Sequence, residues 1–370
     1  MTATAAGRVL AEPAVAQVDL PPFASSAMDG FAVRADDVPG ELPVAYRVAA
    51  GSPAPRPLPA RESAGIATGG AVPTGADAVV PVEVVEDRGD SVVVAAPVVR
   101  GQHIRPRGGD VRAGDTVVHA GVRLRAAQIG SLAAVGVAEV ECTRRPRVAV
   151  IATGSELRSP GSKLGPGQIY ESNRAMIAAV LTQAGAEVDV LPVVVDDRAA
   201  HREAIERGLE ADVLVTSGGV SMGDLDLVRR TEGELGVEEI FWGVAIKPGK
   251  PLSFGIRGET LVFGLPGNPV SSLVGALVFV TPALLARQGA LRPHPPYEVG
   301  TASAAFPRNA HRDEFVRAIR AGEDGMSLEP IRGQESHMIA RAAAADALVH
   351  VPRGDGEIPV GSPVRFLRLD

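Results

Sequence analysis

The chain has 370 residues and a formal net charge of −7, and its 45% apolar and 22% charged residues are typical of a soluble protein with sizeable cores. An isoelectric point near 5.6, without a long block of Lys and Arg, excludes a typical nucleic-acid-binding surface. The single cysteine, Cys142, excludes an intramolecular disulfide and fits a reducing cytosol.

The start of the chain and its hydropathy pattern favour a cytoplasmic protein without a membrane span. Residues 1–13, MTATAAGRVLAEP, lack an apolar core of signal-peptide length, and no run of 18 apolar residues occurs. The length suggests roughly two to four domains. The 42 glycines and 30 prolines, with only 4% aromatic residues, indicate many short strands and loops built on Val and Ala.

Residues 21–105 have the pattern of an all-β lobe. Short Val/Ala runs alternate with Pro, Gly and Asp at strand spacing, and an Ala-rich segment that could form an edge strand at residues 6–15 comes before them. Asp29 before Gly30 is a turn signal that favours a hairpin tip, and the loop at residues 68–77 is dense in small polar residues. Each of these turns is as consistent with an ordinary connection as with ligand contact.

The lobe is closed by residues 105–110, Arg-Pro-Arg-Gly-Gly-Asp, where two guanidinium groups and a carboxylate surround a glycine pair. Such a group suits phosphate recognition, but it is equally typical of a solvated turn. Helical spacing follows at residues 126–135, and Gly136 is a suitable C-cap. We predict that residues 106–146 combine with residues 1–20 in an N-terminal linker domain.

Residues 147–291 alternate strand signals with helical signals, which predicts a doubly wound, mainly parallel sheet. Asn268 and Pro269 form a strong helix start, with Asn as N-cap and Pro at the first helical position. The predicted strands are 148–152, 188–195, 213–215 and 261–263, and the helices begin at residues 172–173, 197 and 268.

Pro293, Pro295 and Pro296 mark a linker, after which residues 292–370 return to short strands separated by Gly/Pro turns. This pattern predicts a small separate β domain. The fold class is therefore α/β plus all-β: a multidomain chain with a doubly wound parallel-sheet domain, an all-β lobe and a C-terminal small β-barrel domain.

Polar groups cluster directly after the predicted parallel strands. Because the carboxyl ends of parallel strands meet at one edge of a sheet, we expect these groups to share a site. One such turn is usually structural, whereas several together favour a site for a phosphate and a hard cation. The turns are Thr153-Gly154-Ser155-Glu156, Asp196-Asp197, Ser217-Gly218-Gly219 with Ser221, Asp224 and Asp226, and residues 264–269.

The turn after residue 215 offers both halves of that site. Ser217, Gly218, Gly219 and Ser221 supply hydroxyl and backbone N–H groups for an oxyanion, and Asp226 supplies a carboxylate. The acidic neighbours Asp197 and Asp224 leave two assignments open: Asp196 or Asp197, and Asp224 or Asp226. Lys247 and Lys250 flank a rigid Pro-Gly turn and could pair with an oxyanion, although exposed lysines at turns are common.

Other catalytic motifs fit poorly or are missing. Residues 219–223 match G-x-S-x-G, but Ser221 follows a glycine pair rather than a strand end, and only His337 could serve as its base. The sequence lacks a P-loop, a Cys/His cluster with zinc spacing and a G-x-G-x-x-G dinucleotide fingerprint.

Seven segments in order along the chain resemble the molybdopterin molybdenumtransferase family, the MoeA-type proteins, which are similar to the E domain of gephyrin. The resemblance implies an elongated homodimer whose α/β domain is of the molybdopterin-binding type. The chain departs from the family pattern in its short N-terminal segment and in Phe31, where tyrosine is more common. The segments are SAMDGFAV (26–33), ATGGAVPTGADAVV (67–80), RPRGGDV (105–111), ATGSEL (152–157), SGGVSMGDLD (217–226), AIKPGKP (245–251) and GLPGNPVSS (264–272).

The family reaction takes adenylylated molybdopterin and molybdate, hydrolyses the adenylyl phosphoanhydride and places molybdenum on the dithiolene, usually with Mg²⁺. Such chemistry needs positioning and charge stabilisation rather than a covalent nucleophile. The resemblance implies a cleft shared between the all-β lobe of one subunit and the α/β domain of the other. It also allows transient contact with the molybdopterin adenylyltransferase that supplies the substrate.

The resemblance assigns roles residue by residue. The implied metal ligands are Glu156 and Asp226. The implied catalytic carboxylates are Asp29, Asp110, Glu156, Asp196 and Asp226, and the further substrate contacts are Thr68, Lys247, Lys250, Pro266, Pro269 and Ser336.

Two alternatives remain. A molybdopterin adenylyltransferase shares the α/β domain type, but the all-β lobe and the C-terminal domain argue against it. A non-enzymatic scaffold would keep the fold and bind a partner, but the complete carboxylate set argues against that.

Overall fold

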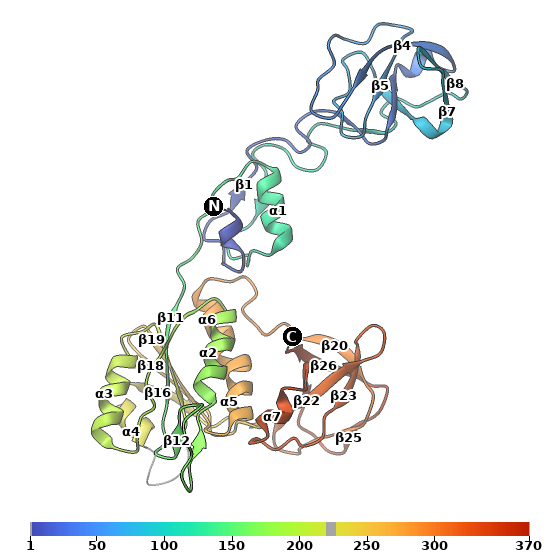
Figure 1. Cartoon of the computed structure of the whole chain (residues 1–370). Helices are drawn as coiled ribbons and strands as arrows, with labels where there is room; N and C mark the ends of the chain where they lie inside the picture. Colours follow the sequence, from blue (N-terminus) through green and yellow to red (C-terminus); the bar gives the residue numbers. More distant parts are fainter. Residues whose placement is uncertain (1, 220–226, 370) are drawn as a thin grey trace. The chain divides into compact units, whose positions relative to one another are not determined.

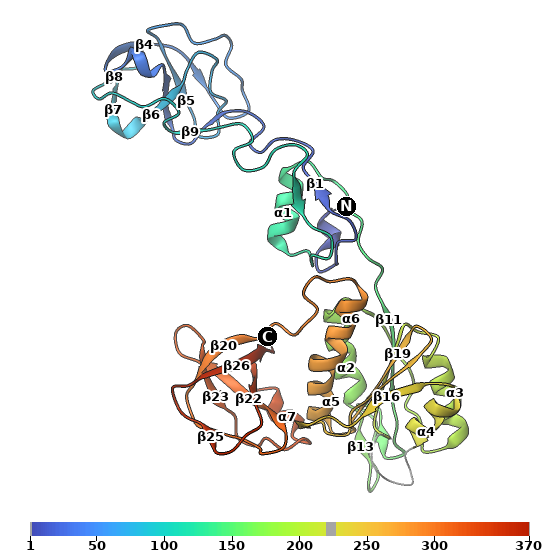
Figure 2. The same ribbon diagram turned by 180° about the vertical axis from the view of Figure 1, so that it is seen from behind.

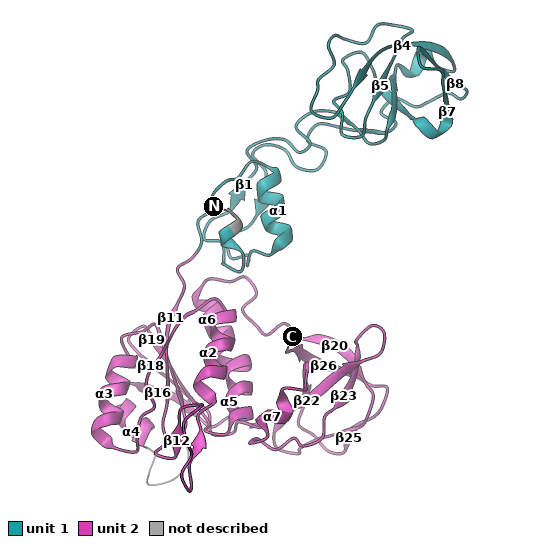
Figure 3. Ribbon diagram, in the orientation of Figure 1, with its two compact units in different colours: residues 1–142 teal, residues 143–370 magenta. Residues whose placement is uncertain are grey.

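The computed structural model describes residues 2–219 and 227–369. The chain divides into two compact units, Met1–Cys142 and Thr143–Asp370 (Figure 3). Each unit has its own hydrophobic cores.

The first unit contains the predicted all-β lobe, at the blue end of Figure 1. Its six-stranded sheet has the order β6-β3-β5-β4-β8-β7, with apolar side chains packed on both faces. The predicted Asp29–Gly30 hairpin is wrong, because β2 and β3 pair with other strands rather than with each other. The elements are β2 (Ser25–Ser26), β3 (Gly30–Val33), η2 (Ala35–Asp37), β4 (Gly40–Val48), β5 (Ser63–Ile66), β6 (Ala78–Pro81), η3 (Val82–Val84), β7 (Val85–Asp87), β8 (Ser91–Val94) and β9 (Ile104–Arg105).

A separate core joins the start of the chain to the segment that follows the lobe. Leu132 of the predicted helix is fully buried there, and Gly136 has a φ of +84°, a value that suits glycine just beyond a helix end. The predicted edge strand at residues 6–15 is limited to Ala14–Val15. The elements are η1 (Thr2–Ala5), β1 (Ala14–Val15), β10 (Thr116–Val118), antiparallel to β1, and α1 (Ala126–Ala134).

The second unit begins with a six-stranded sheet of order β14-β11-β15-β19-β18-β16. The first four strands run parallel, β18 is antiparallel to β19, and β16 is antiparallel to β18. Helices α2, α5 and α6 lie on one face and α3 and α4 on the other (Figure 1; Figure 2 from behind). The predicted doubly wound, mainly parallel sheet is confirmed. Its strands are β11 (Arg147–Ala152), β14 (Glu187–Val190), β15 (Val213–Ser217), β16 (Glu238–Trp242), β18 (Ser253–Arg257) and β19 (Thr260–Leu265).

The strand β15 shows why an apolar run forms the centre of such a sheet. Val213 and Val215 belong to the core beneath α2, whereas Leu214 belongs to the core beneath α3. Successive side chains of a strand point to opposite faces, so a central strand covered on both sides must be apolar throughout. The remaining elements of this domain are β12 (Leu157–Arg158), β13 (Ile169–Tyr170), α2 (Asn173–Gln183), α3 (Arg198–Gly208), α4 (Leu227–Glu234) and β17 (Ile246–Lys247).

Two features of this sheet differ from the sequence prediction. The predicted strand at residues 188–195 ends at Val190, after which only Val194 forms an isolated bridge, with Thr153. The strands β16 and β18 were not predicted. Charged residues in β16 and a glycine in β18 weaken the sequence pattern of a strand. The antiparallel pairing between β16 and β18 stabilises both strands instead.

The predicted helix after Asn268 consists of α5 (Pro269–Gly275), a π-helical segment η4 (Ala276–Val280) and α6 (Thr281–Arg287). Pro269 occupies the first turn as predicted. Residues Pro269–Arg287 are long and apolar enough to cross a bilayer by length and composition, with a mean hydropathy of 1.9. Their buried side chains nevertheless pack in the core beneath α2, as expected of a core helix in a globular domain.

The C-terminal part of the second unit is a barrel, as predicted. Five strands close in the order β22-β23-β20-β26-β24 and back to β22, and β17 adds to β22 from the α/β domain. The barrel interior is filled by side chains such as Phe306 and Phe366. The elements are β20 (Glu298–Ala302), β21 (Phe306–Pro307), β22 (Asp313–Ala321), β23 (Ser327–Pro330), α7 (Ile339–Ala342), β24 (Ala347–Val351), β25 (Glu357–Ile358) and β26 (Pro363–Arg368).

Candidate functional site at the carboxyl edge of the sheet

The carboxyl ends of three neighbouring strands are joined by backbone hydrogen bonds that continue beyond the strands. Thr153 N–H donates to the carbonyl of Ser217 (3.1 Å), and Gly218 N–H donates to the carbonyl of Leu265 (3.1 Å). Gly154 N–H donates to the carbonyl of Val194 (3.0 Å). The predicted polar turns after β11, β15 and β19 therefore lie side by side.

The glycine pair after β15 is required by conformation and by space. Gly218 and Gly219 have φ values of +93° and +68°, which residues with a Cβ rarely adopt. A Cβ on Gly218 would lie 2.8 Å from the carbonyl oxygen of Thr153. The turn thus brings the backbone of β15 close to that of β11. Glycine-rich turns of this kind often form concave sites for anions.

Two of the predicted carboxylates lie beside the turn after β11. The Glu156 carboxylate lies over Gly154, since a Cβ on that glycine would be within 2.9 Å of Glu156 Oε1. Asp196 accepts from the backbone N–H of Ser155 (3.0 Å) and its own N–H donates to the Ser155 hydroxyl (3.0 Å). Both carboxylates are exposed, and within the described ranges neither has a cationic partner.

Asp197 has a different role from its neighbour. It is the N-cap of α3, and its carboxylate accepts from the backbone N–H of Ala200 (2.9 Å). This is the usual capping contact of an aspartate at a helix start. Of the two adjacent acids, Asp196 is the one that faces the turn after β11.

Three sequence candidates in the same region, Ser221, Asp224 and Asp226, lie outside the described residues. Within residues 2–219 and 227–369, no three His, Cys, Asp or Glu side chains gather closely enough to hold a metal ion. The predicted metal pair of Glu156 and Asp226 therefore stays a prediction.

Ser217 lies inside the protein rather than on its surface. Its side chain is only 2% exposed, and its hydroxyl contacts Asn173 Nδ2 (2.9 Å) and the hydroxyl of Ser272 (3.2 Å). The Ser272 hydroxyl donates to the carbonyl of Pro266. The hydroxyl of Ser217 thus supports the turn after β19 and is not directed to solvent.

Ser336 of the barrel domain reaches the same turn. Its hydroxyl accepts from Asn268 Nδ2 (2.9 Å), and its carbonyl accepts from the N–H of Val270 (3.0 Å) at the start of α5. The Asn268 side chain therefore binds Ser336 instead of capping α5, which corrects the predicted side-chain cap. The predicted residues Pro266, Pro269 and Ser336 form one cluster.

Arg317 was missed by the sequence prediction. It is 1% exposed, and its guanidinium donates to the carbonyls of Met338 (2.8 Å) and Gly333 (2.8 Å), which hold the loop that carries Ser336. Burial lowers the pKa of Arg317. The alternation in β22, which puts residue 317 on the same face as Phe315, was the signal that could have identified it as a buried arginine.

Of the predicted lysines, Lys247 ends β17 and Lys250 lies in the connection between β17 and β18. Lys247 Nζ donates to Glu314 Oε1 of the barrel (3.0 Å), and this carboxylate is largely buried. The Lys250 side chain is exposed, while its carbonyl accepts from the N–H of Val244 (2.9 Å). A Cβ on Gly249 would lie 3.7 Å from the carbonyl of Ser271, so this turn packs against α5.

In the first unit, two predicted residues are in direct contact. Asp29 Oδ1 accepts from the backbone N–H of Thr68 (2.7 Å), which joins the two loops quoted for the family resemblance. Asp110 is not part of this contact: its N–H donates to the carbonyl of Leu20 (2.9 Å), and its side chain is exposed. Phe31, at the position where tyrosine is more common, is buried in the lobe core.

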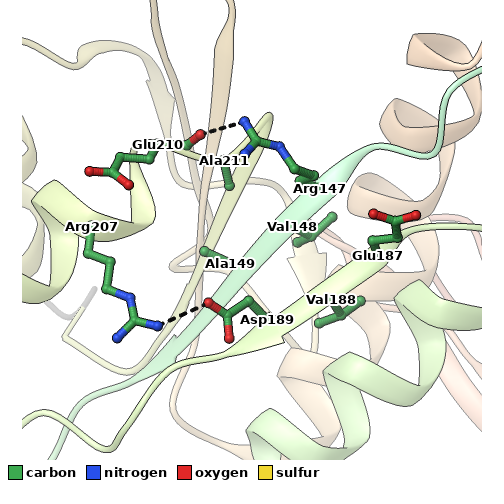
Figure 4. Close-up of a pocket in the computed structure, with 9 residues that line it drawn as sticks. All are labelled: Arg147, Val148, Ala149, Glu187, Val188, Asp189, Arg207, Glu210 and Ala211. Atoms are coloured by element: carbon green, nitrogen blue, oxygen red, sulfur yellow. Dashed lines mark hydrogen bonds and ion pairs between the residues drawn. The ribbon is translucent and has the colours of Figure 1, made fainter.

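A cavity of about 380 Å³ lies on the second unit but away from these residues (Figure 4). It is lined by the first residues of β11 and β14 and by the end of α3. Arg207 pairs with Asp189 (3.3 Å), and Arg147 donates to the carbonyl of Glu210 (2.8 Å). Since the cavity is at the amino ends of the strands, we do not assign the site to it.

The chain matches three family models that together span most of its length. Residues 1–136 match the MoeA N-terminal region (domain I and II), residues 149–286 match a probable molybdopterin binding domain, and residues 299–369 match the MoeA C-terminal region (domain IV).

Full-length relatives agree with these matches. Molybdopterin molybdenumtransferase 2 of Mycobacterium tuberculosis is 41% identical over 99% of this chain and 93% of its own length. Molybdopterin molybdenumtransferase of Haemophilus influenzae is 34% identical over 97% and 91%. The crystal structure of a molybdopterin biosynthesis MoeA protein from Pyrococcus horikoshii aligns over 99% of this chain and 93% of its own, with 29% identity and a TM-score of 0.84. The chain therefore belongs to the MoeA family.

Proposed function

We propose that this protein is a molybdopterin molybdenumtransferase of molybdenum cofactor biosynthesis. It takes adenylylated molybdopterin and molybdate, hydrolyses the adenylyl phosphoanhydride, inserts molybdenum and releases AMP. The observation that supports this best is the carboxyl edge of the sheet, where glycine turns lie beside the carboxylates of Glu156 and Asp196, which have no ion-pair partner within the described residues. Full-length similarity to named molybdenumtransferases supports the reaction class.

The proposed mechanism relies on positioning and electrostatics. The backbone N–H of Gly219 faces the phosphate, whereas that of Gly218 is bonded to the carbonyl of Leu265, and Lys247 and Lys250 supply positive charge for molybdate. Preorganised donors of this kind stabilise charge that develops on a leaving phosphate without a covalent intermediate. Pro266, Pro269 and Ser336 shape the molybdate side of the site, since their segments are joined by the Asn268 and Val270 contacts.

The donor set suits Mg²⁺, although it does not form a complete protein cage among the described residues. Mg²⁺ usually binds one or two carboxylates together with substrate phosphates and water. We propose that Glu156 and Asp226 hold it, with Asp196 alongside, and that it supplies Lewis-acid stabilisation of the phosphoanhydride when bound. Asp196 is favoured over Asp197, because the Asp197 carboxylate caps α3.

We propose that Asp29, Thr68 and Asp110 act on the same substrate from the all-β lobe of a second copy of the chain. The direct contact between Asp29 and Thr68 supports a preformed patch on the lobe. The active form would be a cytoplasmic homodimer with a shared cleft, which receives its substrate from a molybdopterin adenylyltransferase. Sedimentation at concentrations used for assay tests the dimer directly.

The function is tested by measuring AMP release from adenylylated molybdopterin with and without molybdate and Mg²⁺. Release that requires molybdate is the expected result. An enzyme that instead consumes ATP and transfers AMP to molybdopterin would be an adenylyltransferase, and a folded protein with neither activity would be a scaffold. Either outcome contradicts the proposal.

A further inference from the structure

The residue at the start of α2, Asn173, connects two parts of the candidate site that are far apart in sequence. Its side chain is nearly buried, with 9% of the residue exposed. Nδ2 donates to the hydroxyl of Ser217 (2.9 Å) at the end of β15 and to the carbonyl of Gly267 (2.8 Å) in the turn after β19. An amide nitrogen has two protons, so both are used.

A buried hydroxyl pair completes the same network. Ser272 is fully buried, and its hydroxyl contacts Ser217 (3.2 Å) and donates to the carbonyl of Pro266. Two successive carbonyls of the turn, those of Pro266 and Gly267, are thus held from inside by side chains. A carbonyl that faces the interior needs such a partner, because an unpaired one costs the desolvation penalty.

The network sets the distance between two backbone turns. A Cβ built on Gly267 would lie 3.6 Å from the Cα of Gly218, so the turn after β19 and the glycine pair after β15 are in contact. Gly218 N–H also donates to the carbonyl of Leu265 (3.1 Å), directly before the held turn. The Asn173 amide lies beneath this contact and bonds to both sides of it.

We propose that Asn173 is a positioning residue: it fixes the turn of residues 266–268 against Gly218, so that both turns present one anion-binding surface. This inference rests on the proposed function. Asn173 is directed into the protein and does not touch substrate; it acts through Ser217 and Gly267. A displacement of the turn weakens molybdate binding, since misplacing a binding group by about 1 Å is costly.

The substitution Asn173→Asp tests this without changing side-chain shape. It replaces the nitrogen that donates both hydrogen bonds by a carboxylate oxygen, which then faces the carbonyl oxygen of Gly267 and the hydroxyl of Ser217. Repulsion between this carboxylate and the carbonyl oxygen of Gly267 pushes the turn away from Gly218. Ser272→Ala is a milder second variant, because it removes the contacts to the Pro266 carbonyl and the Ser217 hydroxyl but leaves both hydrogen bonds of Asn173 in place.

The chain offers a matched control in Gln288. This amide is also buried, at 2% exposure, and its Nε2 also donates two hydrogen bonds, to the carbonyls of Ala184 (3.1 Å) and Leu284 (3.0 Å). It joins the opposite end of α2 to α6, away from the strand carboxyl ends. Gln288→Glu therefore makes the same chemical change in the same domain but at a distance from the site.

The experiment compares the wild type, N173D, S272A and Q288E by three measurements: thermal unfolding, molybdate binding by calorimetry without pterin, and the KM for molybdate in AMP release. We expect N173D to weaken molybdate binding and raise this KM about tenfold and S272A about threefold, while Q288E stays within about twofold of wild type despite a similar loss of thermal stability.

Equal KM and binding values for N173D and the wild type, or an equal change in Q288E, would overturn the inference. If N173D does not fold, the inference is judged on S272A and Q288E: equal KM values for molybdate in these two variants would overturn it. The calorimetric measurement of molybdate binding tests this inference independently of the proposed reaction. A wild type that binds molybdate but releases no AMP refutes the function alone, whereas a wild type that does not bind molybdate refutes the inference as well.

Discussion

At the amino end of the six-stranded sheet, the carboxylate of Asp212 is buried and accepts hydrogen bonds from the guanidinium of Arg144 and the backbone N–H of Arg147. At the carboxyl end, Glu156 and Asp196 are exposed, and within residues 2–219 and 227–369 neither carboxylate pairs with a guanidinium; that of Asp196 accepts from the backbone N–H of Ser155. The same residue type thus serves structure at one end, where its charge is compensated, and is left available for a ligand at the other. Carboxylates without a cationic partner therefore distinguish the candidate site better than the mere presence of acidic residues does.

The largest expected effect would come from removing an uncompensated carboxylate. Glu156→Ala and Asp196→Ala should each lower the rate of AMP release about 100-fold, because a preorganised group at the phosphoanhydride is lost. Their unfolding temperatures should stay close to that of the wild type, since both side chains are exposed. Steady-state AMP release and thermal unfolding check this, and a large loss of stability in either variant would contradict the contrast between the two ends.

Asp212→Asn should have the opposite profile. The hydrogen bond and charge of Arg144 hold the pKa of Asp212 far below its usual range. Loss of the charge should lower the free energy of unfolding by about 2 kcal/mol, less than for a fully buried ion pair, because solvent screens the exposed Arg144. The KM for molybdate should not change.

The pH dependence of this variant follows from the sign of the pKa shift. Because the pKa of Asp212 is lower in the folded state, its contribution is full above the unfolded pKa of about 4 and is lost as the pH falls towards the folded pKa. Urea unfolding at pH 7 and at pH 3 should therefore show a smaller stability difference between D212N and wild type at pH 3. A difference independent of pH would show that the ion pair is not its source.

Lys247→Ala extends the comparison to a charged group that is partly paired, between the fully paired Asp212 and the carboxylates of the candidate site. Lys247 is half-exposed and pairs with Glu314 (3.0 Å), so part of its charge is compensated inside the protein. We expect a roughly tenfold rise in the KM for molybdate, with a smaller change in kcat. Molybdate titration of initial rates checks this; an unchanged KM would restrict Lys247 to joining the α/β domain and the barrel.

Asp197→Ala should have the smallest effect. Loss of the cap on α3 should lower the free energy of unfolding by about 1 kcal/mol and leave AMP release unchanged. The matched comparison is Asp196→Ala, one residue earlier. Similar losses of activity in the two variants would mean that the adjacent acids are not separated in role.

The sequence predicted the parallel core of the sheet because the run at residues 213–215 is apolar on both faces, as only a central strand can be. It did not predict β16, where Glu238 and Glu239 interrupt the apolar pattern and pairing with β18 stabilises the strand instead. The Asp29–Gly30 turn was interpreted as a hairpin because local turn signals do not show that β3 pairs with strands distant in sequence.

For the candidate site, carboxylates after strand ends could be found from spacing, and the structure brings Glu156 and Asp196 to one edge as that spacing predicts. The supporting residues could not. Asn173 resembles an ordinary helix cap in sequence, and Arg317 resembles an ordinary strand residue. Their roles depend on carbonyls supplied by distant loops. Roles of this kind come from tertiary contacts, which local patterns do not encode.

The most direct test of the central claim is a single-turnover measurement of AMP release from adenylylated molybdopterin by wild type, E156Q and D212N with molybdate and Mg²⁺. We expect molybdate-dependent release by wild type and D212N at similar rates and a loss of about 100-fold in E156Q. Equal rates in E156Q and wild type would contradict it.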